Sequence, residues 1–224
     1  MRGVSWNSQR GQECHDNRDM GGYFAGEQFT FALIVDISQR GPRGAGFARD
    51  WTRHVLERVR THRSLSPEEA INAMRQACQA LRREYPAESG SYAAVIIDSQ
   101  RHTAFGISCG DCRLGVLRGE HIEWFSPVHT LAASLTNAEN STPELSPNRH
   151  ILTRSLKARR FTHPEVVPFE PGLGSVLLAT DGYWVEHLIE QVPFHQLADD
   201  ASCLMLSAGS STVSSDCDNW LVLS

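Results

Sequence analysis

Lysine is nearly missing from this 224-residue sequence, in which Lys157 is the only one. No G-x-x-x-x-G-K-[ST] pattern surrounds that residue, and this excludes a P-loop nucleotide-binding site. None of the ten histidines forms the H-E-x-x-H pair that is typical of zinc proteases. Any catalytic site must therefore be built from other residue types.

Long apolar runs, cysteines and excess positive charge are also scarce. No run approaches the roughly 20 residues that a membrane-spanning helix needs, and residues 1–19 lack the apolar stretch of a signal peptide. Six scattered cysteines are few for a disulfide scaffold. The net charge of -5 gives no basic surface for nucleic acid. We therefore expect a cytoplasmic protein that binds neither membranes nor nucleic acid.

The first half of the sequence predicts a strand followed by two consecutive helices. Residues 29–36 (FTFALIVD) are nearly all apolar, as in a buried strand. Apolar residues then recur every four positions over 47–59, which predicts an amphipathic helix. Residues 66–69 (SPEE) combine a cap, a proline at the first helical position and a capping-box glutamate. They begin a second helix, which Pro86 stops.

From Tyr92 onward the apolar period changes to two, which is typical of strands. Strands are expected at 92–97, 102–108, 113–118, 121–125, 150–156, 175–180, 202–206 and 220–223, with a short helix at 184–191. Residues 137–149 are polar and rich in turn formers, as in a surface loop. The tryptophans at 51, 124, 184 and 220 are expected to pack against core faces. The order of elements predicts an α+β layered sandwich.

Four aspartates lie at the ends of predicted strands: Asp19, Asp36, Asp181 and Asp199. Carboxylates at strand ends can meet at one sheet edge, where they repel one another unless hard cations neutralise them. Two bridged cations can generate a hydroxide nucleophile and hold a phosphoryl group. Each aspartate taken singly also suits a turn cap, so the residues alone leave both interpretations open.

Six segments resemble, in order, those of the metal-dependent serine/threonine protein phosphatases of type 2C, the PPM family. They are FALIVD, SGSYAAVII, SCGDCRLGVLRGEHIEWFSPVHTLA, LTRSL, LLATDG and DDASCLML. The resemblance spans residues 17–206, and LLATDG with CGDCR are its more specific parts. It implies a small bacterial member: one domain over 1–224, folded as a four-layer α-β-β-α sandwich of two antiparallel sheets with helices on the outer faces, and a flap at 131–149.

The resemblance also implies a site with two Mg²⁺ or Mn²⁺ ions. Asp19, in N17-R18-D19, resembles a metal ligand, and Asp36 resembles the carboxylate that bridges both ions; these two are the expected catalytic residues. The carbonyl of Ile37 stands where the family uses a glycine carbonyl, and Asp181 and Asp199 resemble the remaining ligands. A bridging hydroxide would then hydrolyse phosphoserine or phosphothreonine in a protein substrate, opposite a cognate Ser/Thr kinase.

The last ligand has two alternatives in the sequence. Asp200 is adjacent to Asp199 and can share its role. Asp218 begins DNWLVL, and its spacing after Asp181 is nearer to that of the family. Asp199 is favoured because DDASCLML fits the family through its serine and the strand that follows.

Three positions depart from the family pattern. Cys14 stands where the family has an arginine that holds phosphate, Ile37 replaces a glycine, and Ser38 replaces a frequent histidine. Loss of the arginine removes a bidentate charged contact to phosphate, unless Arg10 or Arg18 takes its place. The alternative function is therefore a catalytically weak or inactive phosphatase-like module that binds a phosphoprotein or a kinase.

Two further patterns involve Cys112. Together with Arg118 it matches the C-x5-R of cysteine-dependent phosphatases, but the residues between alternate like a strand instead of forming a glycine-rich phosphate loop. With Cys109 it forms a pair that suits redox chemistry or zinc, although no second pair lies at ligand spacing. A tight hairpin between two strands accounts for both cysteines.

Overall fold

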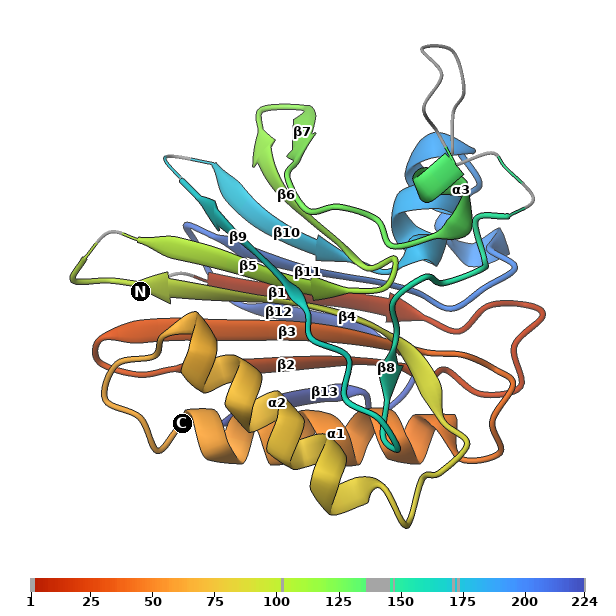
Figure 1. The fold of residues 1–224 in the computed structure, drawn as a ribbon. Helices are drawn as coiled ribbons and strands as arrows, with labels where there is room; N and C mark the ends of the chain where they lie inside the picture. The colour runs from red at the N-terminus through yellow and green to blue at the C-terminus, as the bar shows by residue number, and fades with distance from the viewer. Residues whose placement is uncertain are drawn as a thin grey trace.

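The structure is a computed structural model, and it describes residues 3–101, 103–135, 146, 148–170, 172 and 174–223. Two β-sheets face each other, and two long helices cover the outer face of one of them (Figure 1). None of the helices in the described ranges is long and apolar enough to cross a bilayer.

Both sheets draw their strands from distant parts of the chain. The six-stranded sheet has the order β12 (Thr212–Ser215), β1 (Gly3–Gln9), β11 (Ala201–Ser207), β10 (Ser175–Ala179), β6 (Arg113–Arg118) and β7 (His121–Trp124). The seven-stranded sheet has the order β13 (Trp220–Leu223), β2 (Asp19–Ala25), β3 (Phe29–Ile37), β4 (Ser89–Asp98), β5 (Ala104–Cys109) and β9 (Glu165–Phe169), with β8 (Leu156–Lys157) paired to β4.

Helices α1 (Gly44–Val59) and α2 (Pro67–Leu81) pack side by side on the seven-stranded sheet. The apolar residues that recur every four positions in α1 are all buried there. Helix α2 begins with the expected capping box, in which Ser66 accepts from the Glu69 backbone N–H and Glu69 accepts from that of Ser66. The two helices thus fix the side of the sheet that faces away from the other sheet.

Alternation along β3 decides which residues point between the sheets. Phe31, Leu33 and Val35 belong to the core under the helices, whereas Ala32 and Ile34 belong to the core between the sheets. Since side chains alternate along a strand, Asp36 points to the same face as Ile34. The end of β3 therefore brings a carboxylate to the edge of the space between the two sheets.

The described residues also contain three shorter helical segments. Helix α3 (Leu131–Leu135) and the π-helix η2 (Gly182–Ile189) lie at one end of the sandwich (Figure 1), and a 3₁₀ turn, η3 (Phe194–Gln196), follows η2. The side chains of Trp184 and Val185 in η2 pack with Ala179 at the end of β10.

The two-sheet sandwich predicted from the sequence is confirmed, with three corrections. The sheets are mixed and not purely antiparallel, because β1 with β12 and β2 with β13 are parallel pairs. Long helices lie on one outer face only, in the part of the chain that the structure describes. The strand expected at 150–156 is wrong: there is an isolated bridge at Leu152, and only the short β8 follows. Residues 136–145 and 147 of the expected flap lie outside the described residues.

Candidate functional site

An acidic cavity of about 470 Å³ opens where several strands of both sheets end. Its walls carry four carboxylates, Asp36, Asp111, Asp181 and Asp199. Asp36 lies near the end of β3, Asp111 in the turn between β5 and β6, Asp181 directly before η2, and Asp199 two residues before β11. Both sheets therefore deliver carboxylates to one space. Ile37 also lines this cavity.

Asp19 stands behind this cavity, next to Asp36. The two residues are directly opposite each other on β2 and β3, so their side chains share one face of the sheet. The Thr180 hydroxyl donates to Asp19 Oδ2 at 3.1 Å. Asp19 Oδ1 is buried and has no hydrogen-bond partner among the described residues. Asp19 is not in the lining of the acidic cavity and lines a separate cavity of about 530 Å³.

Burial and mutual repulsion disturb the ionisation of these carboxyl groups. Loss of hydration on burial raises the pKa of Asp19, Asp36 and Asp181 well above the usual range, and neighbouring charges raise it further. At Asp36 the repulsion comes from Asp19, Asp181, Asp111 and Asp199, in that order. Asp36 is thus the carboxylate that every other member of the cluster affects.

The cluster fits divalent cations that prefer oxygen ligands. An unpartnered buried carboxylate oxygen and a directly opposed pair of carboxylates are both costly without a counter-charge, and Mg²⁺ and Mn²⁺ prefer such oxygens. Within the described ranges, the one group of three with its ligand atoms all within 4.8 Å is Cys14, Asp199 and Asp200. Asp36, Asp111 and Asp181 line the acidic cavity outside this group.

The three candidates for the last ligand lie in different surroundings. Asp199 lines the acidic cavity and accepts from Cys14 Sγ at 3.2 Å. Asp200 is buried and already accepts backbone N–H groups of Gly11 and Arg18 at 3.0 and 2.8 Å. Asp218 is 86% exposed and pairs with Arg49 Nη2 at 3.3 Å. Of the three, Asp199 alone reaches the acidic cavity in the described structure.

Two glycines let the chain bring these carboxylates together. Gly110, just before Asp111, has a φ of +105°, a conformation that few residues other than glycine adopt. Gly182, just after Asp181, leaves no room for a side chain, because a Cβ there would lie 2.2 Å from the carbonyl oxygen of Asp200. These positions explain why the two aspartates are neighboured by glycine.

The turn that carries Asp111 is held by His129, a contact that the sequence did not indicate. The backbone N–H of His129 donates to the Gly110 carbonyl at 2.9 Å, and the Gly110 N–H donates to His129 Nδ1 at 3.2 Å. His129 Nε2 lies 3.2 Å from a carboxylate oxygen of Glu165. Asp111, the aspartate of the CGDCR motif, lines the acidic cavity and was not among the candidate residues from the sequence.

Neither arginine proposed to replace the phosphate-binding one reaches the acidic cavity. Arg18 is 6% exposed, and its guanidinium donates to Asp16 and to the carbonyls of Ser38 and Gly41 at 2.7–2.9 Å. Arg10 lines the separate cavity that Asp19 lines. The basic side chains in the described wall of the acidic cavity are Arg40, Lys157 and His150.

The cysteine-based alternatives are not supported. Cys112 is fully buried, and burial followed by repulsion from Asp36 raises the pKa of its thiol, so it is no thiolate nucleophile. Residues 113–118 form strand β6 and not a phosphate loop.

Residues 106–110 match the spacing G-x-S-x-G of hydrolase nucleophiles. Ser108 is buried within β5, and strand β6 rather than a helix follows β5, so Ser108 is not a hydrolase nucleophile.

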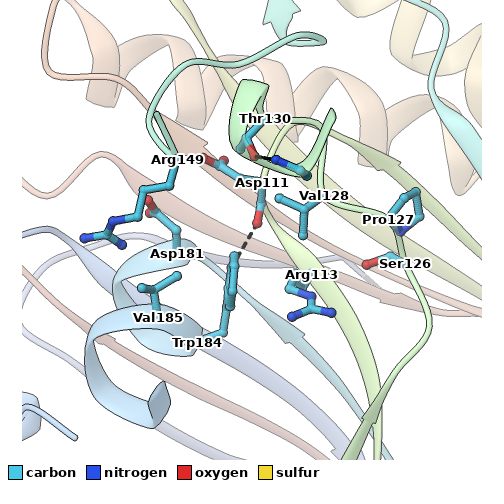
Figure 2. A pocket seen from close by; sticks show the side chains of 11 residues that line it. Asp111, Arg113, Ser126, Pro127, Val128, Thr130, Arg149, Asp181, Trp184 and Val185 are labelled. Atoms are coloured by element: carbon cyan, nitrogen blue, oxygen red, sulfur yellow. Dashed lines mark hydrogen bonds between the residues drawn. The ribbon is translucent and has the colours of Figure 1, made fainter. Parts of the chain in front are cut away.

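A second cavity adjoins the first through Asp111 and Asp181 (Figure 2). The guanidinium of Arg113 lies 4.9 Å from the ring centre of Trp124 and 4.8 Å from that of Trp184, a stacking arrangement that suits arginine. The two tryptophans therefore hold the Arg113 guanidinium beside this cavity. The sequence predicted only that they pack against core faces.

No protein-family model matches the chain. The protein phosphatase PhpP of Streptococcus pneumoniae is 28% identical over 173 residues, which are 73% of this chain and 61% of PhpP. Among solved structures, the serine/threonine phosphatase Stp1 of Staphylococcus aureus matches with a TM-score of 0.78 at 14% identity, over 94% of this chain and 96% of Stp1. The PPM phosphatase MsPP of Mycobacterium smegmatis matches with a TM-score of 0.75 at 19% identity, over 92% of this chain and 98% of MsPP.

The chain has the PPM phosphatase fold. The resemblance seen in the sequence is thus confirmed at the level of the fold. The catalytic domain of PstP, solved in complex with two manganese ions, also has this PPM fold, with a TM-score of 0.72 at 16% identity over 92% of this chain and 97% of that domain. The chain spans about 61% of the length of PhpP.

Proposed function

We propose that this chain hydrolyses phosphoserine and phosphothreonine in proteins with the help of two Mg²⁺ or Mn²⁺ ions. The observation that carries the proposal is the surrounding of Asp36, whose carboxyl group is repelled by those of Asp19, Asp181, Asp111 and Asp199. Ionised carboxyl groups this close together repel one another, and bound cations would neutralise that repulsion. The PPM fold and the 28% identity to a protein phosphatase support the reaction type.

The carboxylates of Asp19, Asp36, Asp181 and Asp199 and the carbonyl of Ile37 would hold the two ions. When bound, the ions would lower the pKa of a water molecule so that it attacks phosphorus near neutral pH, and would neutralise the phosphoryl oxygens. Asp111 is a further carboxylate of the same cavity and adds negative charge that attracts the cations.

The chain's own residues fix the geometry of this site. Thr180 orients Asp19 through a hydrogen bond of 3.1 Å, and His129 holds the turn of Asp111. Arg18 ties the segment after β3 to the segment before β2. Arg40 and Lys157 are the cations of the cavity wall that would meet the remaining phosphate charge.

The implied partners are a phosphorylated protein substrate and the Ser/Thr kinase that phosphorylates it. A cytoplasmic location agrees with the cysteines, because all six are free thiols, including the exposed Cys217. A second candidate function, binding of a phosphoprotein or kinase without turnover, is favoured by Cys14 and by the commitment of Arg18 to other contacts.

The test compares hydrolysis of p-nitrophenyl phosphate and of a phosphothreonine peptide in Mn²⁺, in Mg²⁺ and in EDTA. We expect turnover of both substrates with metal and none in EDTA. Binding of Mn²⁺ without turnover of either substrate would favour the binding module. Turnover that persists in EDTA would contradict a metal-dependent mechanism.

A further inference from the structure

The cavity that adjoins the acidic one is small and mostly apolar. It has a volume of about 200 Å³, less than half that of the acidic cavity. Pro127 and Val128 form one wall, and Trp184 and Val185 of η2 form the opposite one (Figure 2). Ala133 of α3 completes the apolar lining. A cavity of this size suits one side chain and not a folded segment.

The two cavities share a wall. Asp111 and Asp181 line both of them, so a group bound in the small cavity lies next to the proposed metal ligands. A peptide whose phosphate occupies the acidic cavity would therefore place the side chain of an adjacent residue in the small one. This step rests on the proposed function.

The small cavity is lined by charged groups of both signs. Its lining contains two carboxyl groups, Asp111 and Asp181, and two guanidinium groups, Arg113 and Arg149. The guanidinium of Arg113 lies against two indole rings, and Arg149 pairs with Glu190 at 3.6 Å. A charged occupant of either sign would meet a group of like sign at close range, whereas an uncharged occupant meets none. The mixed charges and the apolar walls together favour an apolar side chain.

We propose that the cavity between Val128 and Trp184 is a specificity site, which binds the apolar side chain of the residue next to the phosphothreonine or phosphoserine of the substrate. A branched aliphatic side chain such as leucine buries its surface against both walls, and alanine leaves most of the cavity unfilled. Since a methylene group in an apolar pocket changes kcat/KM about tenfold or more, leucine should exceed alanine by at least about that factor.

The experiment uses phosphothreonine peptides that differ only in the residue before or after the phosphothreonine, which is leucine, alanine, glutamate or arginine. We expect kcat/KM for leucine to exceed that for alanine at least about tenfold at one of the two positions. Glutamate and arginine should be no better than alanine. Equal rates for leucine and alanine at both positions, or a preference for a charged residue, would overturn the proposal.

The variant Val128→Phe fills the cavity, and Val213→Phe makes the same change at a valine that is 57% exposed on β12. The ratio of kcat/KM for the leucine peptide to that for the alanine peptide is measured within each variant. It should fall to within about twofold of one in Val128→Phe and stay at the wild-type value in Val213→Phe. A preserved ratio in Val128→Phe contradicts the proposal. Wild-type turnover of p-nitrophenyl phosphate, which has no flanking residue, tests the phosphatase activity separately, so the two failures are distinguishable.

Discussion

Replacing Asp36 by asparagine should stabilise the metal-free protein and abolish its response to metal. The substitution keeps the shape of the side chain and removes one charge from the centre of the cluster. Asp36 lies directly opposite Asp19, and burial and repulsion hold its pKa well above the usual range. The folded wild type therefore keeps a proton that the unfolded chain loses, so its stability falls as pH rises above the ordinary pKa of 3.8.

The size of the effect follows from the repulsion that an ionised Asp36 meets from Asp19. Opposite residues in an antiparallel pair have Cβ atoms about 5 Å apart, and two charges at that distance repel by about 3 kcal/mol at an effective dielectric constant of about 20. We expect Asp36→Asn to raise the free energy of unfolding by about 3 kcal/mol at pH 7 in EDTA, which raises Tm by about 6–12 °C. At pH 4 the free energy of unfolding should not change.

Thermal unfolding of wild type and Asp36→Asn in EDTA and in Mn²⁺, at both pH values, measures this difference in stability. Mn²⁺ at about 100 times its Kd should stabilise the wild type by about 2.7 kcal/mol and leave Asp36→Asn unchanged, while phosphatase turnover is lost in the variant. Asp98→Asn is the matched control. Asp98 is buried on β4 opposite Phe29, at the end of the β3–β4 pairing that is far from Asp36. Its carboxylate accepts the backbone N–H groups of Gln100 and Arg101 in a turn. A loss of stability in Asp36→Asn at pH 7 in EDTA, or a full Mn²⁺ response, would refute the reasoning.

Three other predictions concern the cysteine, the metal and the helix cap. Cys112→Ser should keep turnover within about twofold, since the thiol is buried and takes no part in the reaction; an inactive but folded variant would revive the cysteine mechanism. The rise in Tm caused by Mn²⁺ should shrink as pH falls from 7.5 to 5, because protons compete for carboxyl groups of raised pKa; a constant rise would argue against these ligands. Ser66→Ala should cost about 1 kcal/mol by removing the cap of α2, seen as a lower denaturant midpoint with unchanged turnover.

The elements that the sequence predicted well are those with a strong local pattern. The apolar run that ends at Asp36 became β3, and the SPEE segment became the start of α2 with both capping bonds in place. Strands 113–118 and 220–223 have the expected bounds. Local apolar period and cap chemistry are sufficient in such segments, because tertiary packing agrees with them.

Strands β1 and β2 were missed because their local signal is weak. Strand β2 contains Gly21 and Gly22, which have low strand propensity, and a Cβ at Gly21 would lie 2.8 Å from the Trp6 ring. Strand β1 (GVSWNSQ) is short, and Val4 and Trp6 are its only large apolar residues. Both become strands because long-range pairing satisfies their backbone groups: β1 pairs with β11, and β2 pairs with β13. No local pattern contains this contribution.

The site was predicted in part. Asp36, Asp181 and Asp199 line one cavity with Asp19 behind it, as the strand ends suggested. Asp111 was missed because an aspartate after a glycine is an ordinary turn residue, and only the fold brings it to the others. The stacking of Arg113 between two tryptophans from β7 and η2 likewise depends on elements that are distant in sequence.

The most direct measurement of the central claim is phosphate release from a phosphothreonine peptide by the wild-type protein, first in EDTA and then after addition of excess Mn²⁺ to the same sample. We predict no release in EDTA and sustained turnover once Mn²⁺ is present. Release in EDTA, or none with Mn²⁺ shown by thermal shift to be bound, would contradict the claim.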